Sequence, residues 1–214
     1  ISAGVEGARD GPGPLPAARM LPRTELAAAR SWLDEVRDRV PRAYRARYEV
    51  AAEVCRNLDL PEDLPTTLIH NDCHPGNSVQ QPDGRVVLID WEGAGRGPAI
   101  VDLGFLLVSC EITAFGPNRL APDPGRLAAI IAGYCRHHRL TARELARLAE
   151  AIRFRAIVAC AGGLRRMVRE GRAEDGADWA WARFAAADAL AARAGEHVAR
   201  LAEQAAGSAG EDER

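Results

Sequence analysis

The chain has 214 residues, which is enough for one well-formed hydrophobic core or at most two small ones. Its 28 basic and 30 acidic residues give a net charge of −2, which argues against a nucleic-acid or membrane-surface partner held by bulk electrostatics. No apolar run approaches the roughly 20 residues that a membrane-spanning helix needs. All of the basic residues are arginine, because the sequence contains no lysine.

The cysteine pattern predicts free thiols in a cytoplasmic protein. The five cysteines are an odd number and contain no CxxC pair: Cys55, Cys73, Cys110, Cys135 and Cys160. This spacing suits a reduced protein better than a disulfide framework. The N-terminus lacks the basic and apolar regions of a signal peptide and begins with Ile1 rather than methionine. We therefore expect a fragment, or a chain whose start has been removed.

Both ends of the chain are predicted to be irregular. Residues 1–22 are rich in glycine and proline and have little apolar surface to offset their ordering entropy, so we expect a flexible linker. A glycine-rich phosphate loop is the alternative, but it needs flanking strands and the sequence shows none. Residues 207–214 are expected to be a disordered tail, which leaves residues 23–206 as one domain.

Apolar spacing predicts two helices before the central segment. Thr24 is a plausible N-cap of a helix that reaches about Val40, where Pro41 stops it. The apolar residues of this helix recur every three or four positions: Leu26, Ala29, Leu33, Val36 and Val40. The second helix has a similar core face, formed by Tyr44, Tyr48, Ala51, Cys55 and Leu58.

Four more helices are predicted after the central segment. Pro98 can open a helix over residues 99–115, which is apolar almost all round and therefore buried. Asp123 caps the next helix, and Thr141 with Glu144 forms a capping box for another long helix. The last helix has a narrow seam of small residues that permits close packing. The expected fold class is α+β, predominantly α-helical, with a β-hairpin at the catalytic site.

Residues 67–92 are predicted to contain this hairpin. Asp83-Gly84 is a strong two-residue turn, because both positions tolerate a positive φ. Folding the chain about that turn pairs residues 79–81 with residues 85–88.

The same register places Asn77 opposite Asp90, and directly opposed residues lie roughly 4.5–5.5 Å apart. An amide oxygen and a carboxylate at this separation can share one hard cation such as Mg²⁺. Asp72, in the loop that enters the hairpin, can face the same point. Phosphoryl transfer needs a group to take the acceptor's proton and cations to neutralise phosphate charge, and these residue types suit both tasks.

Other interpretations of the loop are weaker. His70, Cys73 and His74 could bind zinc, but there is no HxxxH helix and no cysteine pair. A nucleophilic Cys73 lacks an oxyanion feature beside it. His70 is interpreted as a loop-packing residue. Asp102 is either a surface aspartate near a helix start or a carboxylate that braces the loop containing Asp72.

At these residues the sequence resembles the aminoglycoside phosphotransferases and related choline kinase-like small-molecule kinases. Residues 70–77, HNDCHPGN, match the family's HxDxxxxN catalytic loop. Residues 89–92, IDWE, match its metal-binding segment, and residues 97–103, GPAIVDL, resemble the segment that follows. The three motifs occur in the family's order and at its separations.

The resemblance implies the C-terminal lobe of a protein-kinase-like fold, with ATP as donor and Mg²⁺ as cofactor. It assigns Asp72 as the catalytic base, Asn77 and Asp90 as metal ligands, and Asp102, together with the packing residue His70, as support of the catalytic loop. The implied reaction transfers the γ-phosphoryl group to a hydroxyl of a small molecule, such as an aminoglycoside or another amino sugar or amino alcohol.

The sequence departs from the family in one respect. The resemblance implies an N-terminal β-rich lobe with a nucleotide-binding lysine, and this chain has no lysine. We therefore expect the N-lobe to come from the parent chain, and we expect this chain alone to be inactive.

A non-catalytic binding or regulatory domain is the alternative function. Such a domain would use the acidic cleft of a kinase-like lobe to hold a cationic small molecule. The candidate contacts to an amine-bearing ligand are Glu92, Glu174, Asp175 and Asp178, although clustered charges of this kind are usually solvated.

Overall fold

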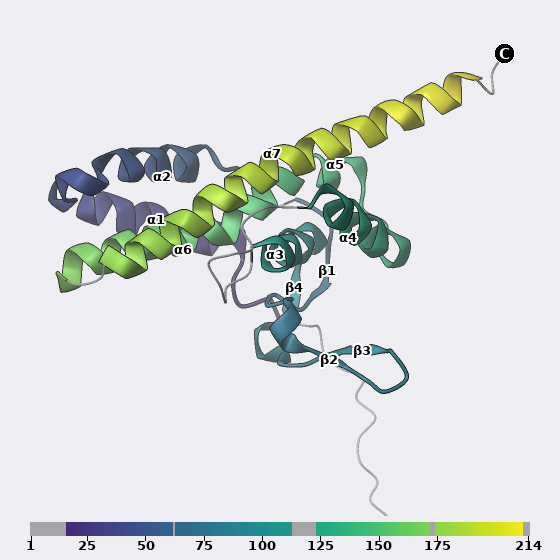
Figure 1. Ribbon diagram of the computed structural model, residues 1–214, viewed down its shortest axis with the longest axis horizontal. Coiled ribbons are helices and arrows are strands. Elements are labelled where there is room, and N and C mark those ends of the chain that lie inside the picture. The colour runs from purple at the N-terminus through teal and green to yellow at the C-terminus, as the bar shows by residue number, and fades with distance from the viewer. Residues whose placement is uncertain (1–15, 62, 113–122, 172–173, 212–214) are drawn as a thin grey trace, which may run out of the picture.

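The computed structural model describes four stretches of the chain, residues 16–61, 63–112, 123–171 and 174–211, apart from the side chains of some of these residues. The α-helices of this part are α1 (Pro22–Val36), α2 (Arg45–Asn57), α3 (Ala99–Glu111), α4 (Pro124–His137), α5 (Ala142–Leu145), α6 (Leu148–Glu170) and α7 (Glu174–Glu211). The strands are β1 (Thr66–Ile69), β2 (Ser78–Gln80), β3 (Val86–Leu88) and β4 (Gly95–Pro98). Figure 1 shows β1 and β4 next to α3, and the β2–β3 hairpin below the helices.

The core forms around α6, which packs against α7, α1, α3 and α2. Because α6 has neighbours on several sides, its buried residues are not confined to one stripe: Leu148, Ile152, Phe154, Ile157, Ala161 and Leu164 are examples. The seam of small residues predicted for α7 is confirmed in the part with described side chains, where Phe184, Ala187, Ala191 and Ala194 are buried. These alanines let α7 approach α6 closely along much of its length.

The first two helices have the predicted apolar faces but different boundaries. All of the apolar residues predicted to face the core in α1 and α2 are buried. However, α1 begins at Pro22, so the predicted N-cap at Thr24 is wrong. Proline is favoured in the first turn because it has no N–H to satisfy and a fixed φ. At its other end, α1 stops at Val36, and a 3-10 turn (Arg37–Arg39) carries the chain to Val40.

Helix α3 is buried as predicted, and it ends at Glu111. Ile112 is the C-cap of this helix, and residues 113–115 of the predicted helix lie outside the described residues. At Gly104 a Cβ atom would lie 2.6 Å from the backbone carbon of Ala151, so the glycine is what lets α3 approach α6 this closely. This contact fixes the helix that carries Asp102 against the central helix.

The caps of the later helices are confirmed, with one difference in helix length. The Asp123 side chain accepts a hydrogen bond from the Gly125 amide at the start of α4. Thr141 and Glu144 form the predicted capping box, but the helix that they open, α5, has only four residues. The chain then turns, and the long helix α6 begins at Leu148.

The structure differs from the predicted linker and tail where it describes them. Ala17 forms a parallel bridge with Arg96 of β4, and the Ala18 amide donates to the Arg96 carbonyl oxygen at 3.0 Å. Ala17 and Ala18, near the end of the predicted linker, are therefore attached to β4. Residues 1–15 lie outside the described part. At the other end α7 continues through the start of the predicted tail to Glu211.

The predicted fold class is confirmed: the described part is mostly helical, with two small antiparallel sheets. Among the described residues, no helix combines the length and the apolar character needed to cross a membrane.

Candidate active site

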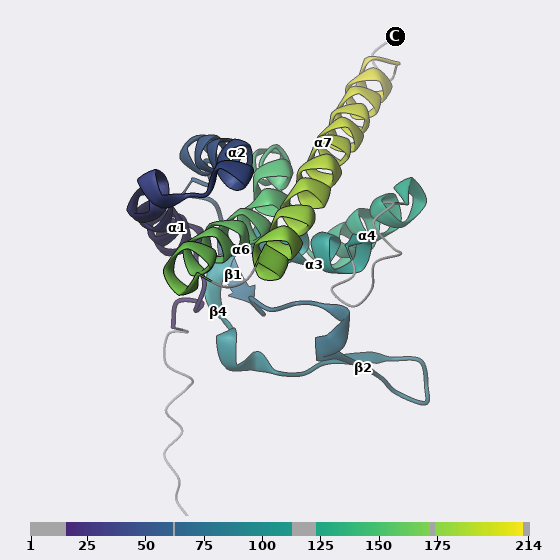
Figure 2. The ribbon, with the colours of Figure 1, turned by 60° about the vertical axis from the view of Figure 1, so that its left-hand side comes forward.

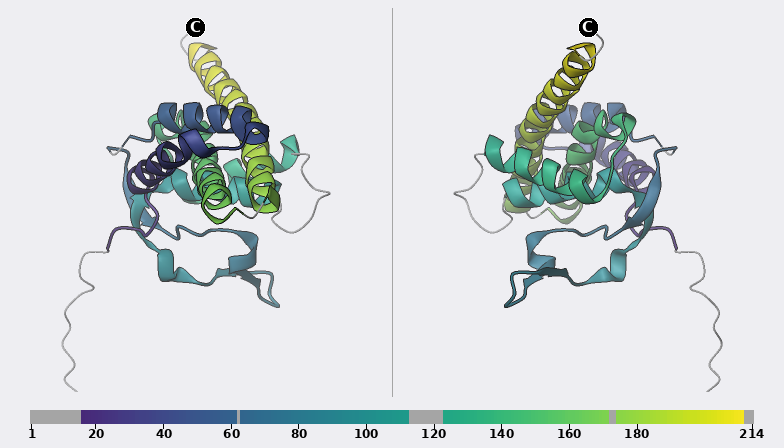
Figure 3. Two further views of the ribbon diagram at one scale, coloured as in Figure 1. Left: turned by 90° about the vertical axis from the view of Figure 1, so that its left-hand side faces the viewer. Right: turned by 90° about the vertical axis from the view of Figure 1, so that its right-hand side faces the viewer.

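The candidate site lies where two arms of the chain separate between two β ladders. β1 pairs with β4, and β2 pairs with β3, both antiparallel. Between the ladders, one arm runs through residues 70–77 and the other through residues 89–94; we call these two arms the ring. Figures 2 and 3 show the arms leaving the β1–β4 ladder, separating, and meeting again at the β2–β3 hairpin.

The hairpin forms as predicted, but its register is shifted. Val79 pairs with Val87, and the Gln81 amide donates to the Arg85 carbonyl oxygen at 2.7 Å, which leaves a three-residue loop rather than a two-residue turn. Only Gly84 has a positive φ (84°) in this loop, whereas the predicted two-residue turn needs a positive φ at both central positions.

The shift changes the partner of Asn77. The Ile89 amide donates to the Asn77 carbonyl oxygen at 2.9 Å, so Asn77 lies opposite Ile89, and the predicted opposition of Asn77 and Asp90 is wrong by one residue. Asp90 instead turns out of the ladder in the left-handed conformation, with φ of 63°.

Asp72 and Asp90 nevertheless reach the same place. Both line a pocket of about 150 Å³, together with Arg19, Met20, Asn71, Glu92, Gly93 and Arg155. Asp72 is half-buried and Asp90 is exposed. The two carboxylates come from opposite arms of the ring, so the pocket joins the arm that carries Asp72 to the arm that begins with the IDWE segment.

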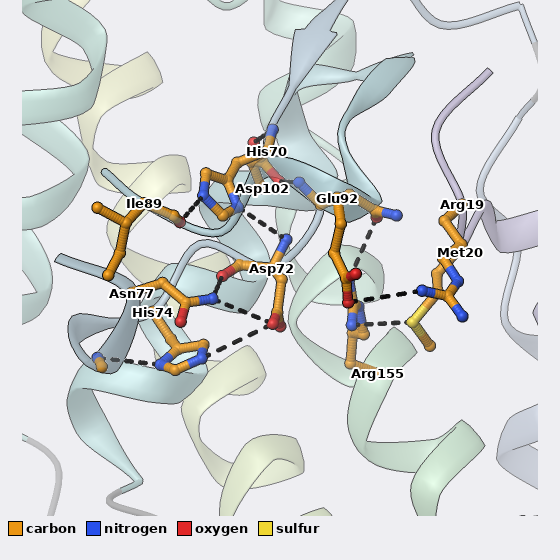
Figure 4. A network of polar contacts seen from close by, with 12 residues as sticks. Arg19, Met20, His70, Asp72, His74, Asn77, Ile89, Glu92, Asp102 and Arg155 are labelled. Atoms are coloured by element: carbon orange, nitrogen blue, oxygen red, sulfur yellow. Dashed lines mark hydrogen bonds and ion pairs between the residues drawn. The ribbon is translucent and has the colours of Figure 1, made fainter. Parts of the chain in front are cut away.

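Asn77 is tied to Asp72 through its side-chain amide. Its Nδ2 atom donates to the Asp72 carbonyl oxygen at 3.1 Å and to Asp72 Oδ2 at 3.2 Å (Figure 4). Both bonds use the amide nitrogen, so the Asn77 Oδ1 atom stays available as a ligand. This oxygen and the two carboxylates are the hard donors that Mg²⁺ prefers, and Mg²⁺ is commonly held by one or two carboxylates with water and phosphate oxygens. The residues present therefore fit a magnesium ion.

Asp102 is buried beneath the first arm and holds its backbone. Its Oδ2 atom accepts a hydrogen bond from the His70 amide at 2.6 Å, and its Oδ1 atom accepts one from the Asn71 amide at 2.8 Å. Burial raises the pKa of the Asp102 carboxyl, and the two amide donors and the Arg155 charge oppose this rise.

His70 crosses the ring. Its Nε2 atom lies 2.8 Å from the Ile89 carbonyl oxygen, and the Asp72 amide donates to its Nδ1 atom at 3.3 Å. One neutral tautomer satisfies both contacts, with the proton on Nε2. The imidazole also stacks at a tilt on Trp91, with 4.6 Å between ring centroids. His70 therefore connects the two arms and is not free to bind a metal.

The zinc and nucleophile alternatives find no support in the described residues. In this part of the chain, no group of three or more His, Cys, Asp or Glu side chains is arranged to hold a metal ion. The His74 Nδ1 atom accepts a hydrogen bond from the Gly76 amide at 3.0 Å. Burial raises the pKa of the Cys73 thiol to about 11, with further contributions from nearby Asp102, Cys110 and Asp72, so the nucleophilic thiolate is scarce near neutral pH.

The four acidic residues suggested as ligand contacts do not form one group in the described part. Glu92 lines the pocket and forms an ion pair with Arg19 at 3.8 Å. Asp178, near the start of α7, is paired with Arg47 of α2. Glu174 and Asp175 lie in the first turn of α7, and their side chains are outside the described part.

Asn71 and Arg155 are among the pocket-lining residues that sequence reasoning missed. Arg155 comes from the middle of α6, where its spacing gives no signal that separates it from the other arginines of the helix. Asn71 lies inside the catalytic-loop motif, but at a position that the motif leaves open. Their place in the pocket depends on how the two arms pack beside α6 in the folded chain.

The fold and the ring define a kinase-like C-terminal lobe. The chain belongs to the phosphotransferase enzyme family, whose model matches residues 7–151. No curated protein matched the chain in a sequence comparison.

Three solved structures are similar to this chain at low sequence identity. A choline/ethanolamine kinase family protein from Mesorhizobium loti is 20% identical with a TM-score of 0.56, over 88% of this chain and 62% of its own. Choline kinase LicA from Streptococcus pneumoniae is 20% identical with a TM-score of 0.50, over 82% of this chain and 56% of its own. Amicoumacin kinase hAmiN, in complex with AMP-PNP, Ca²⁺ and Ami, is 19% identical with a TM-score of 0.46, over 73% and 48%. The chain thus spans less than two thirds of the length of these structures.

Proposed function

We propose that the protein transfers the γ-phosphoryl group of ATP to a hydroxyl group of a small molecule. The observation that carries the proposal is the joint placement of Asp72 and Asp90 in one pocket, from opposite arms of the ring. Family membership supports the reaction class, because the matched model is that of phosphotransferases.

Asp72 suits the role of the base. It is half-buried, its Oδ2 atom is oriented by Asn77, and it faces the pocket in which an acceptor hydroxyl would lie. A positioned carboxylate can take the proton of the attacking hydroxyl as the oxygen forms its bond to phosphorus.

Asn77 and Asp90 would hold Mg²⁺ through oxygen atoms. The ion would neutralise negative charge on the phosphate groups, as it does in phosphotransferases generally. Asp102 and His70 act on the backbone: the first fixes the start of the catalytic loop, and the second joins it to the opposite arm. Together they keep the base and the metal ligands at a fixed separation.

We place the acceptor among amine-bearing alcohols, such as amino sugars or amino alcohols. Glu92 lines the pocket on the same side as Arg19, and its exposed carboxylate can receive an ammonium group in place of that arginine. At 3.8 Å between exposed groups the existing ion pair is weak, so exchanging it costs little.

The test is an assay of the full-length protein, by which we mean the parent chain with the expected N-lobe. It is assayed with ATP, Mg²⁺ and a panel of amino sugars and amino alcohols. We expect release of ADP that depends on one acceptor, and a product carrying one added phosphoryl group. The 214-residue chain by itself should turn over below about 1 s⁻¹, the low end for kinases, because it has no lysine to hold the ATP phosphates. Binding of a cationic ligand without any acceptor-dependent ADP would instead support the non-catalytic binding domain.

A further inference from the structure

We propose that Asn71 and Arg155 are positioning residues that set the separation between the two arms of the ring. The Asn71 side chain connects the base-bearing arm to the arm that begins at Asp90, and Arg155 holds that side chain in orientation. The inference deepens the proposed function, on which the roles of the two arms rest.

Asn71 continues the β1–β4 ladder beyond its last backbone pair. That pair is Ile69 with Gly95, and two residues further on Asn71 stands in register with Gly93. Here φ of Asn71 is 65°, so the backbone has turned out of the ladder. Its side-chain Nδ2 atom donates to the Gly93 carbonyl oxygen at 3.3 Å, and thus supplies the cross-strand bond that the backbone no longer makes.

The two arms have the same unusual backbone feature. Among the described residues other than glycine, only Asn71 and Asp90 have a positive φ. Such a conformation costs up to about 1–3 kcal/mol, less for Asn and Asp than for other residues, and it persists where the surroundings hold it. Asn71 is held by the Asp102 carboxylate at its amide and by Gly93 at its side chain. Each strained residue is a pocket residue, and Asn71 directly precedes Asp72.

Arg155 fixes which way the Asn71 amide points. Its Nη2 atom donates to Asn71 Oδ1 at 3.2 Å, so the amide oxygen faces Arg155 and the amide nitrogen faces Gly93. The guanidinium group is itself located by Phe105, whose ring centroid lies 4.4 Å from its central carbon, and by Met20, whose sulfur accepts from Nη1 at 3.2 Å. The central helix α6 is thereby connected, through one side chain, to both arms of the ring.

This link matters because the ring is open between its ladders. Asn71 and His70 are the two side chains of the first arm that bond to backbone carbonyl groups of the second. Outer partners that orient metal ligands or catalytic groups typically change metal affinity or activity about 10–100-fold when they are removed. Loss of the Asn71 link should therefore affect the site more than the stability of the fold.

The test compares three substitutions in the full-length protein. Asn71→Gly keeps the positive φ and removes both side-chain bonds. Arg155→Met removes the orienting charge. Arg153→Met is the matched control, because Arg153 lies on the same helix and pairs with Asp188 at 2.6 Å, outside the ring. The measurements are Mn²⁺ binding in the presence of AMP-PNP by electron paramagnetic resonance, the melting temperature, and kcat and KM.

We expect Asn71→Gly to weaken Mn²⁺ binding and to lower kcat by about tenfold or more, with a nearly unchanged KM. Its melting temperature should fall by about 2–12 °C, because buried groups lose hydrogen-bond partners. Arg155→Met should also weaken Mn²⁺ binding and lower kcat. Arg153→Met should change neither Mn²⁺ binding nor kcat. Wild-type Mn²⁺ affinity and kcat in Asn71→Gly would overturn the proposal, as would losses that follow the melting temperature equally in all three variants.

Two further experiments keep the test decisive. If Asn71→Gly does not fold, Asn71→Asp replaces it, because aspartate tolerates a positive φ and can still accept from Arg155 but cannot donate to Gly93. If the wild-type protein phosphorylates no acceptor, the proposed function fails and the Mn²⁺ measurement alone decides the role of Asn71. Unchanged Mn²⁺ affinity would then refute it, and a loss specific to Asn71 and Arg155 would support it.

Discussion

Replacing Asp102 by asparagine should weaken the attachment of residues 70 and 71 to α3. The carboxylate is 8% exposed, and its two oxygens accept backbone hydrogen bonds from His70 at 2.6 Å and Asn71 at 2.8 Å. Asparagine keeps the shape but offers only one acceptor oxygen. Its amide group would face the second backbone N–H with a donor, so one buried amide would lose its partner.

The magnitude follows from that single lost bond. A buried donor left without a partner costs about 1–3 kcal/mol. In a chain of this size each kcal/mol lowers the melting temperature by about 2–4 °C, so Asp102→Asn should melt about 2–12 °C below the wild type. Hydrogen exchange followed by NMR gives the local readout: the amides of His70 and Asn71 should exchange faster in the variant.

Glu111→Gln is the matched control. Glu111 is also buried on α3, and its carboxylate accepts from the Asp123 amide at 2.8 Å and from Arg126. This variant should lose stability without faster exchange at His70 and Asn71. The reasoning about Asp102 is refuted if its asparagine variant melts within about 1 °C of the wild type, or if the two amides keep their protection.

Three further predictions concern the metal, the fold and a thiol. Asp90→Asn should weaken Mn²⁺ binding in the presence of AMP-PNP at least about tenfold, measured by electron paramagnetic resonance; equal affinity would exclude Asp90 as a ligand. Gly104→Ala should cost about 1–3 kcal/mol in urea unfolding, because its Cβ would overlap the Ala151 backbone, and unchanged stability would contradict this close approach. Cys73, whose pKa is raised to about 11, should react with iodoacetamide roughly 100-fold more slowly than free cysteine. Since the folded state keeps this proton to a higher pH than the unfolded state, stability should fall from about pH 9 to pH 11, and the fall should be smaller in Cys73→Ala, in which the other buried thiols still contribute.

The helices were predictable because their signals are local. The apolar residues of α1 and α2 recur at helical spacing, and the capping residues of α4 and α5 act within one turn. Boundaries were less predictable, because a proline at the first position can replace a side-chain cap, as Pro22 does in α1.

The site was only partly predictable, because the ring depends on contacts between distant segments. The Asp-Gly turn signal led to a register one residue away from the observed one, since the sequence alone does not distinguish a two-residue turn from a three-residue loop. The β1–β4 ladder was missed because β4 contains two glycines and a proline, which favour a loop. Arg155 reaches Asn71 from a helix 84 positions further along the chain, and no local pattern records such a contact.

The most direct test of the central claim is the substitution Asp72→Asn in the full-length protein. Asparagine keeps the size of the side chain and removes the base, and general-base catalysis typically contributes about 10²–10⁴-fold. We expect kcat to fall by that order, with little change in the KM for ATP and an unshifted melting curve. A variant that keeps most of the wild-type kcat, or that loses activity only in proportion to a lower melting temperature, would contradict the assignment of Asp72 as the catalytic base.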